Sequence, residues 1–477
     1  MFFFIRIARL SADEYDGWTG DAGLIAMALL SYLSQTSSST STSTSTSNTP
    51  NSIHDKTSRL TVEQQQLMEA WIKALPNIQE LKNQHPLLWT QSQQEILQYS
   101  STKNIYKVLD DMEDDFTWWK EHVFDSHRDI FPPTVTLGCS TDDDDNDNNN
   151  IVPCFNMEGF TWAMAIVMSR AYFVEDALRL IPMLDMANHD PIGTVEIQCQ
   201  TVGTLFGSTK AAVLNTGKNA YTTPNKKNKN DNNDKQPQQQ QPQQEQVYVH
   251  YGPAKSGAEF LLDHGFVPSS IQTNTAEILL EIDTTDRFYE DKLDILELQQ
   301  IGTSQIFDVS SRDEPDPQML QFLRLVKLSD TDAFLLESIF RTDVWDFMAE
   351  PVSAINERAV VEYITELCQS LLDDMVDIDI DTTTTTKIKT TEDQNNHVNT
   401  NYCITVQKIE KQALQRTMEY MNREKEALDL KEYYQERRLK SLGLDSEYSD
   451  DENGILPGGG DDELGFGQSR APGSLDW

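Results

Sequence analysis

Low-complexity segments interrupt this 477-residue sequence and limit what it can fold into. They carry few apolar side chains, so they cannot bury enough surface to offset the entropy lost on ordering. We expect disordered loops inserted in a folded frame, without a function of their own. They are the Ser/Thr run 37–47, the Asp/Asn run 141–150, the Asn/Lys/Gln/Pro stretch 225–246, the Thr run 382–386 and the Gly/Asp tail after Leu444.

The segments between these insertions have helical periodicity near both ends and strand patterns in the middle. Up to about Arg170, apolar residues recur every three or four positions within 62–72 and 105–112, and 160–168 is continuously apolar. From Leu178, short β-branched runs predict strands at 195–199, 211–214, 247–251 and 278–282. Beyond Asp286 the helical periodicity returns, with Pro317 as a first-turn residue. The order predicts an α+β fold followed by an all-α module.

The charge balance argues against nucleic acid as a partner. The net charge is −39 and the sequence has no Lys/Arg-rich stripe, whereas binding to duplex nucleic acid depends on cations that displace condensed counterions. A basic protein surface matches this chain better. The chain also lacks G-x-x-x-x-G-K-[ST] and H-E-x-x-H, and its eight histidines show no metal-ligand spacing. We therefore expect neither a metal enzyme nor a nucleotide enzyme.

The cysteines and the apolar runs bear on the compartment. Five cysteines without a C-x-x-C pair favour a reducing environment, hence an intracellular protein of the cytoplasm or nucleus. The apolar run 22–33 is shorter than the roughly 20 residues that span a bilayer, so it predicts a core helix and no membrane partner. Residues 1–10 contain Arg6 and Arg9 and lack a small-residue cleavage site, which is a poor secretory signal. A plastid or mitochondrial address stays open.

Two sequence blocks carry chemistry that composition does not explain. In the first, the apolar stretch after Arg179 ends in Asp185, Asn188 and His189, whose donors and acceptors suit an adenine edge or a ribose. The alternative is a capped turn with a satisfied histidine. In the second, a strand ends at Tyr251, and a Gly-Pro turn leads to a helix from about Ser256, with Glu259 at a capping-box position. The alternative here is a core tyrosine.

Together the blocks Ile-Pro-Met-Leu-Asp-Met-Ala-Asn-His and Tyr-Gly-Pro-x-x-Ser-x-Ala-Glu-x-Leu-Leu-Asp-x-Gly-Phe-Val resemble a known family. They are similar to the C-terminal half of the SET domain in lysine methyltransferases of the Rubisco large-subunit methyltransferase type. Residues 160–173 resemble the helix that leads into it, and the C-terminal third, with Phe322-Leu-Arg-Leu-Val, resembles the helical substrate-binding domain. The resemblance runs from about Trp71 to Leu430. It implies a SET domain over 1–283 (helical insert about 11–170, catalytic part 171–283, disordered insert 222–246), a helical substrate-binding domain over 284–440 and a disordered acidic tail over 441–477.

The resemblance also implies roles for individual residues. The fold passes a C-terminal segment through a loop and so brings Asn188 and His189 next to Tyr251. Asn188 and His189 would contact the adenine end of S-adenosyl-L-methionine, Arg170 its carboxylate, and Tyr251 would be the catalytic tyrosine. The channel for the target amine would be lined by Ser169, Arg170 and Asp185. His264, where the family commonly has a second tyrosine, would also contact the substrate.

The expected activity is methyl transfer from S-adenosyl-L-methionine to a lysine of a non-histone protein, by a monomer and without metal. Acidic residues of the helical domain, namely Asp343, Asp346, Glu350, Asp373 and Asp374, would help hold the lysine-bearing protein.

Two departures leave alternatives open. The family's N-terminal SET strands and Gly-rich loop should precede the helical insert, whereas residues 1–10 run almost directly into the apolar segment 22–33. This predicts either an incomplete gene model or a SET-derived binding module with little or no activity. His264 is the second departure. Relatives that methylate actin histidine also lack a tyrosine there, which leaves a protein-histidine methyltransferase as the other alternative.

Overall fold

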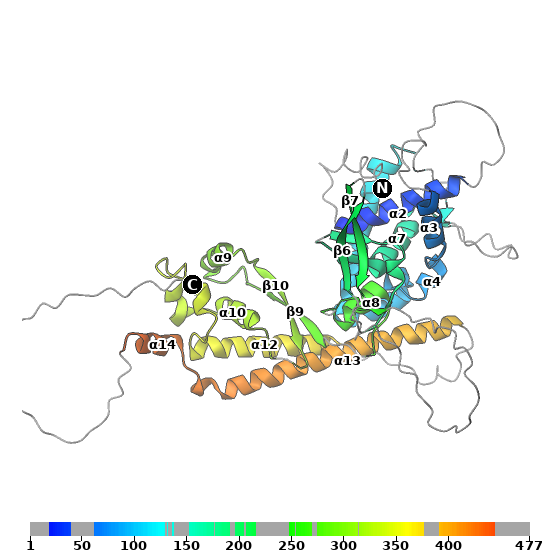
Figure 1. The fold of residues 1–477 in the computed structure, drawn as a ribbon. Helices are drawn as coiled ribbons and strands as arrows, with labels where there is room; N and C mark the ends of the chain where they lie inside the picture. Colours follow the sequence, from blue (N-terminus) through cyan, green and yellow to red (C-terminus); the bar gives the residue numbers. More distant parts are fainter. Residues whose placement is uncertain are drawn as a thin grey trace, which may run out of the picture.

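The computed structural model shows two bodies, each with its own hydrophobic core (Figure 1). It describes residues 19–39, 62–128, 131, 136–137, 152–175, 177–190, 196–204, 207–215, 248–252, 254–269, 274–312, 314–375 and 391–443. Four of the five low-complexity segments lie outside these residues. The fifth, the Ser/Thr run, is helical over its first three residues, so the expected loop was wrong there. A helix once formed extends through serines at little cost, and the rest of the run lies outside the described residues.

The first body is built mainly from helices around α7 (Met157–Arg170). Residues Gly159 to Val167 of this helix are all buried, which explains their continuous apolar character. The predicted core helix is present as α2 (Gly20–Ser39), and the other two periodic segments form α3 (Val62–Lys73) and α6 (Asn104–Trp119). The remaining helical pieces of this body are α4 (Ile78–Lys82), η2 (Pro86–Leu88), α5 (Gln91–Gln94), η3 (Glu95–Tyr99), η4 (Ser101–Lys103), η5 (Lys120–Phe124), η6 (Leu184–Met186) and α8 (Gly257–His264).

In the described residues of this body the strands form two-stranded ladders, one before α7 and three in the predicted region of short strands after it. Three ladders are antiparallel: β1 (Thr136–Leu137) with β2 (Val152–Pro153), β3 (Ala171–Val174) with β4 (Ala177–Leu180), and β6 (Glu196–Thr204) with β7 (Gly207–Asn215). The fourth pairs β5 (Asn188–His189) with β8 (Tyr248–Val249) in parallel. Parallel neighbours need a long connection, and these two strands are far apart in sequence.

The second body combines one antiparallel pair of strands with helices. β9 (Thr275–Glu281) pairs with β10 (Ser304–Ser310), a strand that periodicity did not predict because its residues are mostly polar and half exposed. The helices are α9 (Tyr289–Leu298), α10 (Pro317–Val326), η7 (Asp330–Leu336), α11 (Val344–Phe347), α12 (Ala354–Asp374), α13 (Thr391–Glu426), η8 (Leu428–Leu430) and α14 (Tyr434–Ser441). Pro317 occupies the first turn of α10, as expected.

The strand β9 packs with the second body. Ala276, Ile278 and Leu280 of β9 are buried in the second core, because their alternate side chains face the helices that follow. The expected division after residue 283 stays a prediction.

The long helix α13 joins the two bodies (Figure 1). Its residues Cys403 and Val406 are buried in the first core, whereas Ala413, Leu414 and Met421 are buried in the second. Helix α13 thus contributes buried side chains to both cores.

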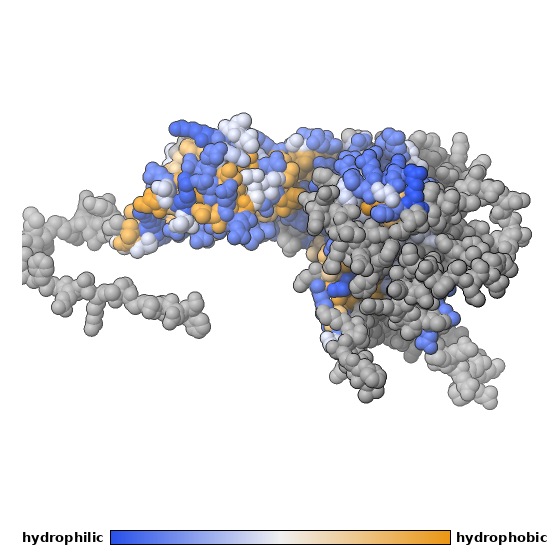
Figure 2. All heavy atoms as spheres, turned by 90° about the horizontal axis from the view of Figure 1, so that it is seen from above, coloured by the Kyte–Doolittle hydropathy of each residue, from blue (hydrophilic) through white to orange (hydrophobic). Residues whose placement is uncertain are grey.

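Three further observations concern the surface, the cysteine thiols and the length of the helices. Apolar and hydrophilic residues are interspersed over the visible face of the second body (Figure 2). Within the described residues, Cys154, Cys199, Cys368 and Cys403 are free thiols. Among those residues, too, the helices are all too short or too polar to cross a bilayer.

Candidate active site

The parallel ladder of β5 and β8 places the two predicted sequence blocks side by side. Asn188 lies opposite Tyr248 and His189 opposite Val249. Beyond the ladder, the backbone N–H of Tyr251 donates to Nδ1 of His189 over 3.3 Å. The predicted proximity of Asn188-His189 to Tyr251 across the intervening chain is therefore confirmed. Because Nδ1 of His189 accepts this hydrogen bond, the neutral ring carries its proton on Nε2.

Tyr251 lies with its hydroxyl on a backbone carbonyl and its ring among aromatic side chains. The hydroxyl donates to the carbonyl oxygen of Ala187 over 2.9 Å. The ring centroid lies 4.6 Å from that of His264, 5.2 Å from that of His189 and 6.4 Å from that of Phe266. Burial raises the pKa of Tyr251, so the phenol keeps its proton at neutral pH. It can donate a hydrogen bond but it cannot serve as an anionic base.

Asp185 is a buried carboxylate held from two sides. The indole N–H of Trp71 donates to both carboxylate oxygens, over 3.1 and 2.9 Å. Nη1 of Arg170 lies 3.2 Å from the backbone oxygen of Asp185 and 3.4 Å from its carboxylate. The Asp185 side chain is fully buried and that of Arg170 is partly exposed. Arg170 thus positions the segment before Asn188, and its other guanidinium nitrogens are the ones left for a ligand carboxylate.

His264 closes the opposite side of the site. It is the last residue of α8, which begins with the predicted capping box of Ser256 and Glu259. Nδ1 of His264 lies 3.2 Å from the carbonyl oxygen of Ser169, at the end of α7. Burial, followed by the charge of Lys255, lowers the pKa of His264 to about 3. The imidazole is therefore neutral at physiological pH.

The remaining predicted residue, Asn188, is exposed. Its amide offers two donors and one acceptor to an incoming ligand. The next residue, His189, is half-buried, and its pKa is lowered by burial and by the neighbouring His250. The residues expected at the site thus all lie around one region between the end of α7, β5, β8 and α8. Their individual roles stay predictions.

Two contributors to this region were not predicted. Trp71 looked like one more apolar position on a periodic helix, and no sequence signal separates an indole that packs from one that also donates to Asp185. Lys255 lay in a turn without a motif of its own. Only the structure shows that its ammonium reaches the side chains of Asp263 and His264.

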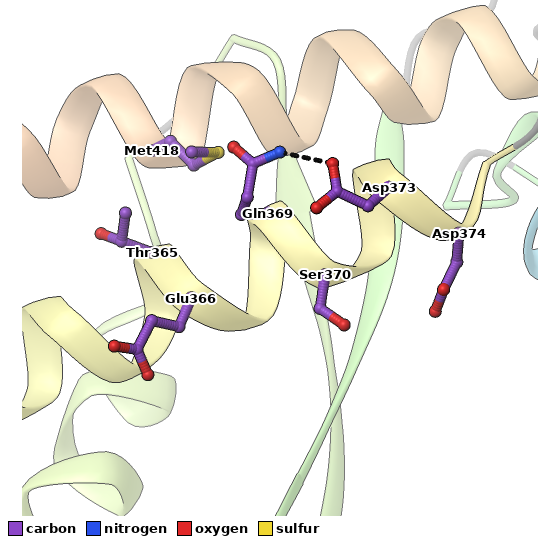
Figure 3. A pocket seen from close by; sticks show the side chains of 7 residues that line it. All are labelled: Thr365, Glu366, Gln369, Ser370, Asp373, Asp374 and Met418. Carbon is purple, nitrogen blue, oxygen red and sulfur yellow. Dashed lines mark hydrogen bonds between the residues drawn. The ribbon is translucent and has the colours of Figure 1, made fainter.

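The expected acidic contact surface for a substrate falls on the second body. Asp373 and Asp374 of α12 line a hollow of about 440 Å³ beside α13 (Figure 3). At the edge of this hollow the Gln369 side chain donates a hydrogen bond to the Asp373 carboxylate over 2.8 Å. Met418 of α13 lines the hollow as well. The other lining residues are Thr365, Glu366 and Ser370. Asp343 is the N-cap of α11, Asp346 lies within this helix and Glu350 follows it. These three residues do not line the hollow. A role of these carboxylates in holding a protein stays a prediction.

Comparison with known proteins identifies relatives for both bodies. The family model described as Rubisco LSMT substrate-binding matches residues 283–414. The Rubisco large-subunit N-methyltransferase of Nicotiana tabacum is 31% identical over 345 residues, which cover 72% of this chain and 62% of the relative. The fructose-bisphosphate aldolase-lysine N-methyltransferase of Arabidopsis thaliana is 29% identical over 364 residues, covering 75% and 66%. The chain thus spans about two thirds of the length of these curated relatives. The actin-histidine N-methyltransferase of Mus musculus is 26% identical, with coverage of 67% and 48%.

Solved structures give the same result for the fold. The SET domain of LSMT bound to lysine and AdoHcy superimposes with a TM-score of 0.57 at 25% identity, covering 80% of each chain. Rubisco LSMT bound to AdoMet gives 0.55 at 26% identity, again with 80% of each chain covered. The predicted fold class, an α+β SET domain followed by a helical substrate-binding domain, is confirmed.

Proposed function

We propose that this chain, a SET-domain protein of the Rubisco large-subunit methyltransferase type, transfers a methyl group from S-adenosyl-L-methionine to a lysine of a non-histone protein. The observation that carries the proposal is the parallel pairing of β5 with β8. It sets Tyr251 beside His189 and directs the tyrosine hydroxyl at the carbonyl of Ala187. A tyrosine that only fills the core would not need the exposed Asn188 and the half-buried His189 beside it. Nor would it need a hydroxyl that donates to a backbone carbonyl.

The chemistry of the side chains around this ladder fits the cofactor. Asn188 is exposed and has an amide that can donate and accept, as an adenine edge requires. His189 adds an Nε2–H donor, because Nδ1 already accepts from Tyr251. Arg170 supplies a partly exposed cation for a carboxylate. When bound, S-adenosyl-L-methionine would supply a methyl group on a positive sulfur. An uncharged amine would bond the methyl carbon in line as the carbon–sulfur bond breaks, the neutral thioether S-adenosylhomocysteine would leave, and the new ammonium would lose a proton to solvent.

The residues of the site favour this displacement by position and polarity rather than by acid or base catalysis. A free lysine has a pKa of about 10.4, so an apolar and cation-bearing channel must favour the uncharged amine. Tyr251 stays protonated at physiological pH, so it adds no negative charge that would hold the amine in its charged form. The carbonyl of Ser169 and the phenol of Tyr251 fix the line of attack.

We further propose that the helical domain holds the protein substrate and that the target is a lysine rather than a histidine. The curated lysine-methylating relatives are more similar to the chain than the actin-histidine relative, and they are chloroplastic by name. We therefore propose the plastid as a candidate compartment of this chain, besides the cytoplasm and the nucleus. We also propose that the chain divides into a SET domain and a helical substrate-binding domain. We propose in addition that it is a monomer.

The experiment separates the cofactor contact from the transfer step. Transfer of labelled methyl groups to proteins of a lysate is measured next to calorimetric binding of S-adenosyl-L-methionine. We expect Tyr251→Phe to lose most of the transfer while its affinity for the cofactor changes by a few fold at most, and Asn188→Ala to weaken the cofactor itself. Tyr106→Phe is the matched control, since it also removes a hydroxyl bonded to a backbone carbonyl, that of Gln94, on an exposed part of α6.

The outcomes separate the alternatives. A chain that binds no S-adenosyl-L-methionine would instead be a SET-derived binding module. Labelled protein digests in which the methyl group lies on histidine would make it a protein-histidine methyltransferase. Equal loss of binding and transfer in both variants would contradict the assigned roles of Tyr251 and Asn188.

A further inference from the structure

Lys255 has no assigned role, yet its ammonium lies next to the histidine that closes the site. It occupies the turn between Tyr251 and the N-cap of α8, where its backbone N–H donates to the carbonyl of Gly252 over 3.2 Å. Its Nζ bonds the carboxylate of Asp263 and lies 3.3 Å from Nε2 of His264. The side chain is three-quarters buried.

The stem of Lys255 is held in place by the turn itself. A Cβ added to Gly252 would lie 2.8 Å from Cγ of Lys255, a distance that no real side chain tolerates. Glycine at this position thus lets the stem lie against the turn that follows Tyr251.

The ammonium determines which nitrogen of His264 carries the proton. A lysine ammonium has three donors and no acceptor, so Nε2 of His264 must accept. The single proton of the neutral ring therefore lies on Nδ1, which donates to the carbonyl of Ser169 over 3.2 Å. Both ring nitrogens are engaged, and the ring is fixed 4.6 Å from that of Tyr251.

We propose that Lys255 is a positioning residue, which fixes the Nδ1–H tautomer and the orientation of His264 beside Tyr251 and so sets the wall of the acceptor channel. The role in the channel rests on the proposed methyl transfer. The tautomer itself does not, because it follows from the hydrogen bonds alone.

The charges around His264 keep its ring neutral. Burial and the Lys255 ammonium lower its pKa, and the Ser169 carbonyl opposes them weakly. Removing the ammonium would also leave the partly exposed carboxylate of Asp263, adjacent in sequence, without its cation, which favours a proton on the imidazole. The other titratable groups that face the ring are neutral ones, namely His85 of η2, His189 of β5 and Tyr251.

A protonated His264 would place a cation beside the tyrosine and next to the positive sulfur of the cofactor. It would also hold the Ser169 carbonyl more strongly and compete with the target amine for it. Lys255 therefore protects the transfer step against acid, without touching the reacting atoms.

The first test reads the histidine directly in the full chain. Histidines are labelled with ¹⁵N, long-range correlation spectra report the tautomer and charge of each ring, and the signal of His264 is assigned as the one missing in His264→Gln. In the wild type we expect an Nδ1–H ring that stays neutral to below pH 5. In Lys255→Met we expect the pKa of the ring to rise by about one unit, because the like charge is gone while the burial remains. An Nε2–H tautomer in the wild type, or an unchanged ring in Lys255→Met, overturns the proposal.

The second test measures the pH profile of methyl transfer. The acid limb of kcat in Lys255→Met should lie about one pH unit above that of the wild type, so that kcat is up to about tenfold lower at the same acid pH, while the affinity for S-adenosyl-L-methionine holds. Lys255→Arg should restore most of the acid range, and the double variant with His264→Gln should lose the acid limb. Lys82→Met, which removes an exposed lysine paired with Glu158, is the control.

The two measurements separate the two proposals. Absence of methyl transfer in the wild type would refute the proposed function, whereas the spectra would still decide the position of the His264 proton. Normal transfer in Lys255→Met with no shift of the acid limb, in a protein whose His264 spectrum is unchanged, would refute the positioning role alone.

Discussion

A glutamate buried on the helix that joins the two bodies should make the stability of the chain depend on pH. Glu410 of α13 is 2% exposed, and it accepts hydrogen bonds from the backbone N–H and the hydroxyl of Ser101. Burial raises its pKa from the ordinary 4.5 to about 7. The carboxylate of Glu277 on β9 also raises it, whereas Ser101 and Lys103 lower it. The folded chain thus holds this proton more tightly than the unfolded chain does.

The sign and the size of the effect follow from linkage. Because the folded pKa is the higher one, the stabilising contribution is complete below pH 4.5 and is lost as the pH rises to about 7. Each tenfold change in a protonation equilibrium is worth about 1.4 kcal/mol, so the loss amounts to about 3 kcal/mol above pH 8. Glu410→Gln keeps the shape of the side chain but carries no proton to lose. It should therefore be less destabilised than the wild type when the pH rises.

The assay is urea unfolding followed by tryptophan fluorescence, repeated from pH 5 to pH 8.5. The difference in unfolding free energy between Glu410→Gln and the wild type should move in favour of the variant by about 2.5 kcal/mol over this range. Glu419→Gln is the matched control, since Glu419 lies on the same helix with its side chain 69% exposed. A difference that stays constant with pH would refute the reasoning, because Glu410 would then have the same pKa in both states.

Three further changes test the site and the second core. Trp71→Phe removes the indole donor from the buried carboxylate of Asp185 and should cost about 1.5–3 kcal/mol in urea unfolding, with a weaker cofactor affinity by calorimetry. Gly265→Ala should lower the melting temperature by several degrees, because φ is +76° and the new Cβ would lie 2.4 Å from the backbone oxygen of Gln84. Arg324→Met leaves Glu357 buried with Lys431 as its cation, and we expect a loss of about 3 kcal/mol in the same unfolding assay. A loss below about 1 kcal/mol would mean that Lys431 compensates for the arginine.

The sequence by itself determined the elements whose signals are local. The periodicity of α3, α6 and α7, the capping box of Ser256 and Glu259 and the first-turn Pro317 all depend on residues within a turn or two of each other, and the structure has them where they were expected. The two motif blocks likewise gave the candidate residues, because the side chains that carry the resemblance are the ones that line the site. The strand β10 was missed, since a short, polar and half-exposed strand has almost no pattern of its own.

The tertiary structure alone decided how distant residues meet. The ladder between β5 and β8, the reach of Trp71 to Asp185 and the contact of Lys255 with His264 join residues that no local pattern relates. The same holds for β9, whose alternating side chains suit either core until the packing shows which one they enter. The sequence thus names the chemical groups, while the packing sets their charge states. Whether a carboxylate or an imidazole is charged depends on the desolvation and the neighbours that only the assembled fold provides.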